Sequence, residues 1–434
     1  MRRLLLEELI AWKNKPSRQP LILKGVRQCG KTYLLKEFGA QLFPDTAYFN
    51  FEGNTPLQQR FDTDMDVERI ITELGVLRKK AIQPRETLVI FDEIQFCPKA
   101  LTALKYFCEN APQYHVVCAG SLLGIALSKP SSFPVGKVDF LTLRPMSYYE
   151  FLLANGEDML CDYLRGLSLF EPVSDLFAEK LKNYLRTYYI TGGMPEVVAQ
   201  WLQTKDASVV DAVQRKILDG YEFDFAKYAP AKDFPKLSLI WHSIPQHLAR
   251  ENAKFIFSRV KTGLRAKDLE AALEWLIGAG LAVRVAKIEK SFMPVSSYAD
   301  RDYFKLYMAD VGLLRAMSRL PADAILTKSE TYREFKGALA ENYVLCELLN
   351  VYGVAPHYWK SGNTAEVDFI VQAAKDIVPI EVKSDRSNRA RSLAEYRKKY
   401  APRISLKTSL NNISAGEVRN IPLYMLWNIQ VYTR

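Results

Sequence analysis

The sequence predicts an α/β protein with more than one domain, and three observations support this. The chain has 434 residues, which exceeds the usual size of a single domain. A glycine-rich stretch, Gly25 to Thr32, lies between a short apolar run and the start of an amphipathic helix pattern. Near the other end, strand-like apolar runs carry Asp368, Glu381 and Lys383. We therefore expect two chemically distinct sites, one in each of two domains.

The composition is that of an ordinary globular protein, with 48% apolar and 25% charged residues. Glu7 and Glu8 interrupt the N-terminal leucine run, so we expect no signal peptide. No uncharged apolar run reaches the roughly 18 to 20 residues of a membrane-spanning helix. We therefore expect a cytoplasmic protein without a membrane partner.

Cysteine spacing and net charge exclude some kinds of site but do not identify a function. The six cysteines contain no CxxC pair and have no nearby histidine cluster, which argues against a disulfide framework or a structural zinc site. The formal net charge of +10 suits a polyanionic partner such as nucleic acid. Because the charge is spread along the chain, an ordinary solvated surface explains it equally well.

The first candidate site is a phosphate-binding loop. Gly25-x-x-x-x-Gly30-Lys31-Thr32 matches the P-loop spacing in full and stands between a strand pattern and a helix pattern. The glycines, Gly25 and Gly30, let backbone N–H groups approach phosphate oxygens. Lys31 bridges the terminal phosphates and Thr32 holds Mg²⁺. A chance strand-to-helix turn is the structural alternative, and the complete motif argues against it.

A second strand supplies the carboxylates that such a loop needs. Thr87 to Phe91 is an apolar run that ends in Asp92 and Glu93, the pattern of a Walker B element. We expect Asp92 to order the magnesium shell and Glu93 to polarise the attacking water, which indicates hydrolysis of ATP.

The sequence leaves the roles of three further polar residues open. Ser121 follows the apolar run His115 to Ala119, so it would sense the γ-phosphate, position the water or simply serve as a turn serine. Lys137 and Arg144 are the nearest residues for a charge-stabilising finger, although such a finger often comes from a second copy of the chain. Homo-oligomerisation therefore stays open.

Nine short motifs resemble bacterial ATP-binding proteins that join an AAA-type ATPase module to a C-terminal domain of unknown function. These motifs span nearly the whole chain: GVRQCGKTYLL, LVIFDEIQ, CAGSLLG, LRPMSYYEFL, TGGMPEVV, FKLYMADVGLL, ENYV, EVDFIV and IEVKS. Most proteins of this kind read Gly-Arg where this chain has Gly136-Lys137, which counts against a finger at Lys137. The resemblance implies an AAA-type ATPase core with ATP and Mg²⁺ as cofactors.

The middle of the chain is predicted to be helical and then to form a winged helix. Leucine, tyrosine and charged residues recur at helical spacing from about 148 to 229, interrupted by a turn at Gly192-Gly193 for which packing is the favoured explanation. A helix with Lys267, Glu270 and Glu274 then precedes a strand hairpin with Lys287 and Lys290. The two glutamates weigh against DNA binding by that helix, so a docking role is at least as well supported.

The second candidate site lies in the C-terminal part. The runs 367–371 and 378–382 read as a hairpin that puts Asp368 and Glu381 at facing positions, with Lys383 on the same face. Two carboxylates and a lysine suit a hard metal ion. The arrangement is similar to the restriction-endonuclease-like core, which implies Asp368 and Glu381 as metal ligands, Lys383 as the group that positions water and helix-borne Glu341 as an accessory ligand. A charged hairpin without a metal is the structural alternative.

The sequence therefore predicts four parts: a P-loop AAA-type core at 1–150, a helical lid at 151–235, a winged-helix-like domain at 236–325 and a restriction-endonuclease-like α/β domain at 326–434. The leading hypothesis is a Mg²⁺-dependent ATPase whose last domain binds or cleaves DNA or RNA. The alternative is an ATP-dependent regulatory switch in which that domain is a non-catalytic protein-interaction module.

Overall fold

The computed structural model describes residues 1–120, 134–250, 253–327, 329, 332–362, 365–385 and 391–433. The chain divides into two compact units, Met1–Arg144 with Gly278–Gly280, and Pro145–Ile277 with Leu281–Arg434. Among the helices described, none is both long enough and apolar enough to cross a membrane.

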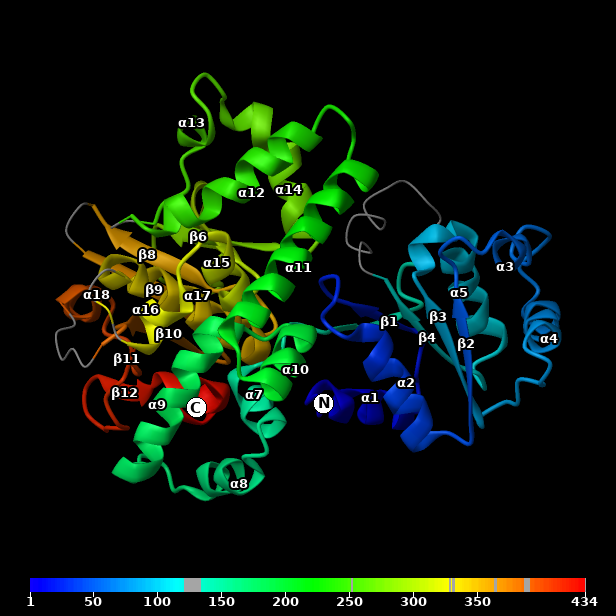
Figure 1. Ribbon diagram of the computed structural model, residues 1–434, viewed down its shortest axis with the longest axis horizontal. Helices are drawn as coiled ribbons and strands as arrows, with labels where there is room; N and C mark the ends of the chain where they lie inside the picture. The colour runs from blue at the N-terminus through cyan, green and yellow to red at the C-terminus, as the bar shows by residue number, and fades with distance from the viewer. Residues whose placement is uncertain are drawn as a thin grey trace. The chain divides into compact units, whose positions relative to one another are not determined.

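Unit 1 is built on a parallel sheet with the strand order β2-β3-β4-β1-β5 (Figure 1). Its elements are α1 (Leu5–Asn14), β1 (Leu21–Lys24), α2 (Lys31–Leu42), β2 (Asp45–Asn50), α3 (Thr55–Gln59), α4 (Val67–Leu77), β3 (Thr87–Asp92), α5 (Pro98–Asn110), β4 (His115–Ala119) and β5 (Asp139–Thr142). The strands predicted before the P-loop, at the Walker B element and at 115–119 are β1, β3 and β4. Since β1 lies between β4 and β5, the order reverses beside it, and ligands of open α/β sheets bind at such a point.

The core of unit 1 explains why these runs become buried strands. β3 and β4 are buried at every position, and one apolar cluster joins them to α4 and α5. Four phenylalanines (Phe51, Phe61, Phe91 and Phe107) contact one another within it, with ring centroids 5.5–6.2 Å apart. Helices that cover a parallel sheet exclude water from its strands. The ends of β3 and β4, where the polar residues follow, are therefore held by a packed core.

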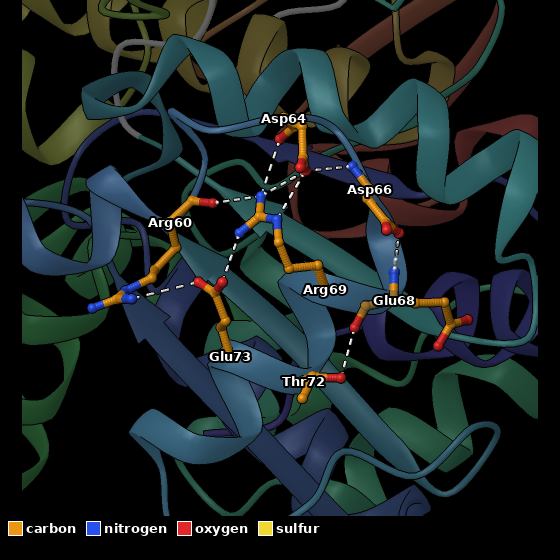
Figure 2. Close-up of polar contacts among 7 residues, drawn as sticks. All are labelled: Arg60, Asp64, Asp66, Glu68, Arg69, Thr72 and Glu73. Carbon is orange, nitrogen blue, oxygen red and sulfur yellow. Dashed lines mark hydrogen bonds and ion pairs between the residues drawn. The ribbon is translucent and has the colours of Figure 1, made fainter.

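The connection into α4 is fixed by an ion-pair network that Figure 2 shows in detail. Arg69 contacts Asp64 at 2.8 Å and Glu73 at 2.9 Å, and it also donates to the carbonyl oxygen of Arg60 at 3.1 Å. The Asp66 carboxylate accepts from the backbone N–H of Glu68 and so caps the first turn of α4. One guanidinium thereby holds the loop before α4 against the helix itself.

Unit 2 begins with a run of helices, as the sequence predicted. They are α7 (Tyr148–Ala154), α8 (Asp158–Gly166), α9 (Asp175–Thr191), α10 (Pro195–Thr204), α11 (Ala207–Tyr228), α12 (Phe234–Leu248), α13 (Phe257–Val260) and α14 (Ala266–Gly278). The turn between α9 and α10 is a packing turn. Gly193 donates its N–H to Asp310 at 2.6 Å, and a Cβ on Gly193 would lie 2.1 Å from the Met146 carbonyl oxygen.

The rest of unit 2 forms one mixed sheet with the order β12-β11-β10-β9-β8-β6-β7 (Figure 1). The elements are β6 (Ala282–Ile288), β7 (Ala299–Met308), α15 (Val311–Met317), α16 (Ala322–Leu326), α17 (Arg333–Tyr352), β8 (His357–Ser361), β9 (Ala365–Ala373), β10 (Asp376–Val382), α18 (Arg391–Tyr400), β11 (Leu406–Ser409) and β12 (Arg419–Pro422). The predicted hairpins are β6–β7 and β9–β10, both antiparallel.

The sheet differs from the separate winged-helix domain that we expected at 236–325. β6 pairs in parallel with β8, so the expected wing belongs to the same sheet as the carboxylate-bearing hairpin. Ile288 of β6 is packed in one core cluster with Trp359 of β8 and Val367 of β9. Burial of these three side chains explains why the hairpin joins the C-terminal sheet.

Candidate functional site

The P-loop connects β1 to α2 in a backbone conformation that needs its glycines. Gly30 has φ +95° immediately before α2, in the region that glycine tolerates best. At Gly25 the space is also closed, because a Cβ there would lie 2.2 Å from the Leu143 carbonyl oxygen. The loop therefore delivers the N–H groups of the α2 N-terminus to one point, where an anion is stabilised.

Lys31 is held above this loop. Its side chain is buried, and its Nζ donates to the carbonyl oxygens of Gly25 at 2.8 Å and Val26 at 2.9 Å. The ammonium is thus held against the loop that we predict to bind phosphate.

Asp92 meets the P-loop directly. Its Oδ2 accepts from the Thr32 hydroxyl at 2.8 Å and from the Tyr48 hydroxyl at 2.8 Å, while Oδ1 accepts from the backbone N–H of Glu93 at 3.0 Å. Burial raises the pKa of Tyr48, and the bond to Asp92 raises it further, so the phenol stays a donor. A hydroxyl and a carboxylate oxygen are donors that Mg²⁺ accepts, either directly or through water.

Tyr48 is the residue that sequence reasoning missed at this site. It lies on β2, which runs parallel to β3 with Tyr48 opposite Ile90 and Asn50 opposite Asp92. A strand pattern in Asp45-Thr-Ala-Tyr-Phe-Asn50 was visible in the sequence, but the pairing of β2 with β3 was not.

Glu93 directly follows the last residue of β3 and has a left-handed backbone conformation, with φ +49°. Such a conformation costs energy for a residue other than glycine and turns the side chain out of the strand direction. The carboxylate accepts a hydrogen bond from the Gln95 amide, which fixes its orientation. Gln95 is a second residue that the motif alone did not indicate.

Three predicted groups of unit 1 remain: Ser121, Lys137 and Arg144. Ser121 lies outside the described residues. Lys137 forms an exposed ion pair with Glu109 at 3.0 Å. The carbonyl oxygen of Arg144 accepts from Arg3 at 2.6 Å, where the first unit ends. The finger residue thus stays a prediction.

The second set of predicted residues lies on one face of the unit 2 sheet. Phe369 pairs with Ile380, so the preceding Asp368 and the following Glu381 face each other across β9 and β10. Asp368 accepts from the backbone N–H of Val382 at 2.7 Å. Burial raises the pKa of Asp368, and the nearby charge of Glu341 adds to this.

Glu381 is buried between Lys383 and the helix α18. Its Oε1 lies 2.7 Å from the Lys383 Nζ, and its Oε2 accepts from the backbone N–H of Leu393 at 3.1 Å. Leu393 is in the first turn of α18, so the carboxylate also meets the positive end of that helix. Both oxygens of Glu381 therefore have partners within unit 2.

Glu341 projects from α17 toward the same face, where a lysine meets it. Its Oε2 accepts from the Tyr307 hydroxyl at 2.8 Å and lies 3.4 Å from the Lys305 Nζ. Lys305 is 1% exposed and also contacts Glu366 at 2.7 Å. Burial alone would lower the pKa of Lys305, but Glu341 and the other acids around it raise it well above the ordinary value.

Glu341, Asp368 and Glu381 were expected to hold a metal together. Within the described ranges, no three histidine, cysteine, aspartate or glutamate side chains gather closely enough to hold a metal ion. A buried ammonium, that of Lys305, lies beside Glu341, and the Lys383 ammonium contacts Glu381. Lys305 was missed because β7 precedes β9 by many residues, and its strand pattern gives no sign that it shares a sheet with the hairpin.

Comparisons with known proteins agree with the P-loop geometry. Residues 17–152 match the model of an AAA domain. Residues 182–324 and 336–426 match two models described as domains of unknown function, DUF8612 and DUF4143. The search of curated proteins gives no match. The AAA domain thus covers the whole site formed by Lys31, Thr32, Asp92 and Glu93, and AAA domains bind nucleotides.

Solved structures with some similarity come from several organisms. A Walker-type ATPase of Pyrococcus abyssi is 15% identical over 73% of this chain and 95% of its own, with a TM-score of 0.46. The ORC1 protein of Aeropyrum pernix, solved in complex with DNA, is 14% identical over 74% and 92%, with a TM-score of 0.27. DnaA of Aquifex aeolicus, bound to AMPPCP, is 13% identical over 64% and 86%, with a TM-score of 0.28.

Proposed function

We propose that the chain is a Mg²⁺-dependent ATPase whose second unit binds nucleic acid on the sheet face that carries Asp368 and Glu381. One observation carries the ATPase proposal: the Thr32 hydroxyl and the Asp92 carboxylate are hydrogen-bonded at 2.8 Å beside the buried ammonium of Lys31. This arrangement, within the residues that match the AAA domain, supports Lys31 as a phosphate ligand and Thr32 and Asp92 as metal ligands.

Each residue has a separate task in this proposal. The α2 N-terminus and Lys31 bind the β- and γ-phosphates, and Tyr48 orients Asp92 through its hydrogen bond. Mg²⁺, when held by Thr32 and Asp92, would neutralise charge on the phosphate oxygens. Glu93, oriented by Gln95, accepts the proton of the attacking water.

Two variants of the full chain test the ATPase. Lys31→Ala removes the cation on the phosphates, so nucleotide binding or turnover should be lost while the thermal unfolding temperature stays close to that of the wild type. Glu93→Gln keeps the metal ligands, so ATP should still bind while hydrolysis falls by about 100-fold or more, the scale of a lost general base. Equal hydrolysis by wild type and Glu93→Gln would contradict the role of Glu93.

For unit 2, the proposal rests on the order of its elements and on the charges of one face. The helix α17 carries Glu341, β9 carries Asp368, β10 carries Glu381 and Lys383, and α18 follows. In a nuclease, the carboxylates would hold a divalent cation and Lys383 would position water. A cleavage assay on single-stranded, double-stranded and branched DNA and RNA, with Mg²⁺ or Mn²⁺, distinguishes cutting from binding.

A second candidate function has a specific observation in its favour. Lys305 already places a buried ammonium between Glu341 and Glu366, at 3.4 and 2.7 Å. This arrangement favours an ATP-dependent switch in which the C-terminal part interacts with a partner without catalysis. Absence of cleavage with every substrate and both metals would support this alternative.

A further inference from the structure

The sheet face that carries Lys305 continues into a basic cavity in unit 2. The cavity has a volume of about 570 Å³, within the usual range for small-molecule sites. Five cationic side chains line it: Arg250, Lys254, Arg259, Lys287 and Lys360. Glu366 is the acid of the same lining. A cavity with this excess of positive charge favours an anionic occupant.

The local sequence explains how the cations converge. The segment after α12 runs beside β7. There the backbone of Lys254 forms an isolated antiparallel β-bridge with that of Lys305, and the N–H of Phe255 donates to the carbonyl oxygen of Phe304 at 2.9 Å. Lys287 lies at a bulge of β6, opposite Tyr358 of β8. Two strands, one loop and the short helix α13 therefore present their cations to a single space.

These cations are only partly neutralised. Lys287 contacts Asp300 at 3.3 Å, and Lys360 contacts Glu366 at 3.3 Å. Within the described part of the chain, no ion pair joins Arg250, Lys254 or Arg259 to a carboxylate. Burial lowers the pKa of Lys254, and the charge of Lys287 lowers it further. An incoming anion would relieve this repulsion.

Aromatic rings supply a second kind of contact. Tyr303 and Tyr358 both line the cavity. Tyr303 is 43% exposed, with the ammonium groups of Lys254 and Lys287 at 3.4 and 4.3 Å from its ring centroid. Both ammonium groups lie over the ring, so a base stacks on Tyr303 when the lysines turn from the ring to the phosphate of the same nucleotide. Bases stack on aromatic side chains while phosphates pair with lysine and arginine, which makes this exchange match a phosphate attached to a planar base.

The cavity leads directly to the nuclease-like residues. Glu366 lines the cavity, and Asp368 lies two residues further along β9 on the same face of the sheet. Two residues of a strand span about 7 Å. A strand held in the cavity by one nucleotide would therefore bring a neighbouring phosphodiester toward Asp368 and Glu381, which a free nucleotide would not do.

We infer that this cavity binds one nucleotide unit of a single-stranded nucleic acid, with its phosphate among Lys254, Arg259 and Lys287 and its base against Tyr303. The inference rests on the proposed binding of nucleic acid by unit 2 and names the place where the strand is held.

The test uses the full chain and labelled single-stranded DNA and RNA oligonucleotides at several salt concentrations. The variant Lys254→Glu/Arg259→Glu changes two cavity cations on a loop and a four-residue helix. The control Arg215→Glu/Lys232→Glu makes the same change of net charge at exposed positions that do not line the cavity. Thermal unfolding and ATP hydrolysis check that both variants are folded.

The cavity variant should bind at least about 10-fold more weakly than the control. Its dependence of log K on log salt should be shallower by about 0.7, since one neutralised phosphate of a single strand accounts for about 0.7 and the cavity holds one phosphate. Tyr303→Ala should weaken binding by about 5-fold or more, with rescue in Tyr303→Trp.

Competing ligands distinguish a strand from other phosphate sources. AMP and inorganic phosphate should compete only at concentrations far above that of the oligonucleotide, and equal competition by AMP would overturn the strand assignment. Equal affinities of the cavity variant and the control would overturn the inference while leaving the proposed function intact. Absence of strand binding by the wild type would overturn both. Binding that depends on the cavity, without any cleavage, would remove only the nuclease part of the proposed function.

Discussion

Glu347 of α17 should make the stability of the protein fall as the pH rises through the neutral range. Its side chain is fully buried among tyrosines, and its Oε1 accepts from the backbone N–H of Tyr148 at 2.8 Å. No described group partners Oε2. Burial raises the pKa of Glu347 from 4.5 to about 8. The folded protein therefore keeps a proton at pH 7 that the unfolded chain has released.

The direction and the size of the change in unfolding free energy with pH follow from this difference in proton binding. Stabilisation by Glu347 is fully present below the unfolded pKa of 4.5 and is lost as the pH rises through the folded pKa of about 8. Each pH unit in this window costs about 1.4 kcal/mol, so between pH 5 and pH 8 the loss is on the order of 3 to 4 kcal/mol. Glu347→Gln has nearly the same shape and cannot ionise, so it should lack this component.

The measurement is urea unfolding of wild type and Glu347→Gln at pH 5, 6, 7 and 8. The quantity compared is the change of each protein's unfolding free energy with pH, and not its absolute value. Any unpaired donor in the variant affects all pH values equally and cancels in this comparison. Glu179→Gln, on the exposed side of α9, is a control that should follow the wild type. Parallel curves for wild type and Glu347→Gln would refute the assignment of a buried neutral carboxyl group.

Three further predictions concern the remaining features. Tyr48→Phe removes the donor that orients Asp92, so the Mg²⁺ concentration for half-maximal ATP hydrolysis should rise about 10- to 100-fold, whereas an unchanged Mg²⁺ dependence would exclude this role. The proposed nuclease role requires Asp368 to bind a metal although the described residues contain no preformed cluster of three ligands. If the role holds, Asp368→Ala abolishes the heat of Mn²⁺ or Mg²⁺ binding to the nucleotide-free chain while Asp376→Ala, on the same hairpin, keeps it. Identical traces for wild type and Asp368→Ala would indicate a charged hairpin without a metal site. Asp66→Ala removes the cap of α4 shown in Figure 2 and should lower the free energy of unfolding by about 1 kcal/mol, with Asp66→Asn close to wild type; equal losses in both variants would contradict the capping role.

The parts that sequence predicted well are those in which one local pattern contains all the necessary residues. Gly25 to Thr32 carries its own strand, loop and helix signals, so the P-loop and α2 could be located without knowing any other strand. The Walker B strand likewise ends in Asp92 because its apolar run is continuous. The hairpin of β9 and β10 was visible for the same reason.

Features that depend on distant pairing could not be predicted in this way. Tyr48 reaches Asp92 only because β2 is the neighbour of β3, and Lys305 reaches Glu341 and Glu366 only because β6 and β7 join the C-terminal sheet. An isolated lysine in a strand pattern has no sign of its partners. For the same reason the sequence did not indicate that the hairpin of the expected winged helix enters the C-terminal sheet, since apolar periodicity predicts a hairpin but not its sheet.

Lys305 changes how the charges of the second site should be understood. Two facing carboxylates, Asp368 and Glu381, need a nearby cation when they are desolvated, and sequence alone suggested a metal ion for this purpose. In the structure, Lys383 contacts Glu381 and Lys305 neutralises part of the charge near Asp368. These two lysines thus supply positive charge that sequence alone assigned to a metal, so a metal is not the sole means of balancing the carboxylates. The variant Lys305→Met tests whether Lys305 only balances charge or also positions the carboxylates for a metal. If Lys305 only balances charge, the variant should bind Mn²⁺ at least as tightly as wild type, because a competing cation is gone. Weaker binding would show that Lys305 positions the carboxylates for the metal.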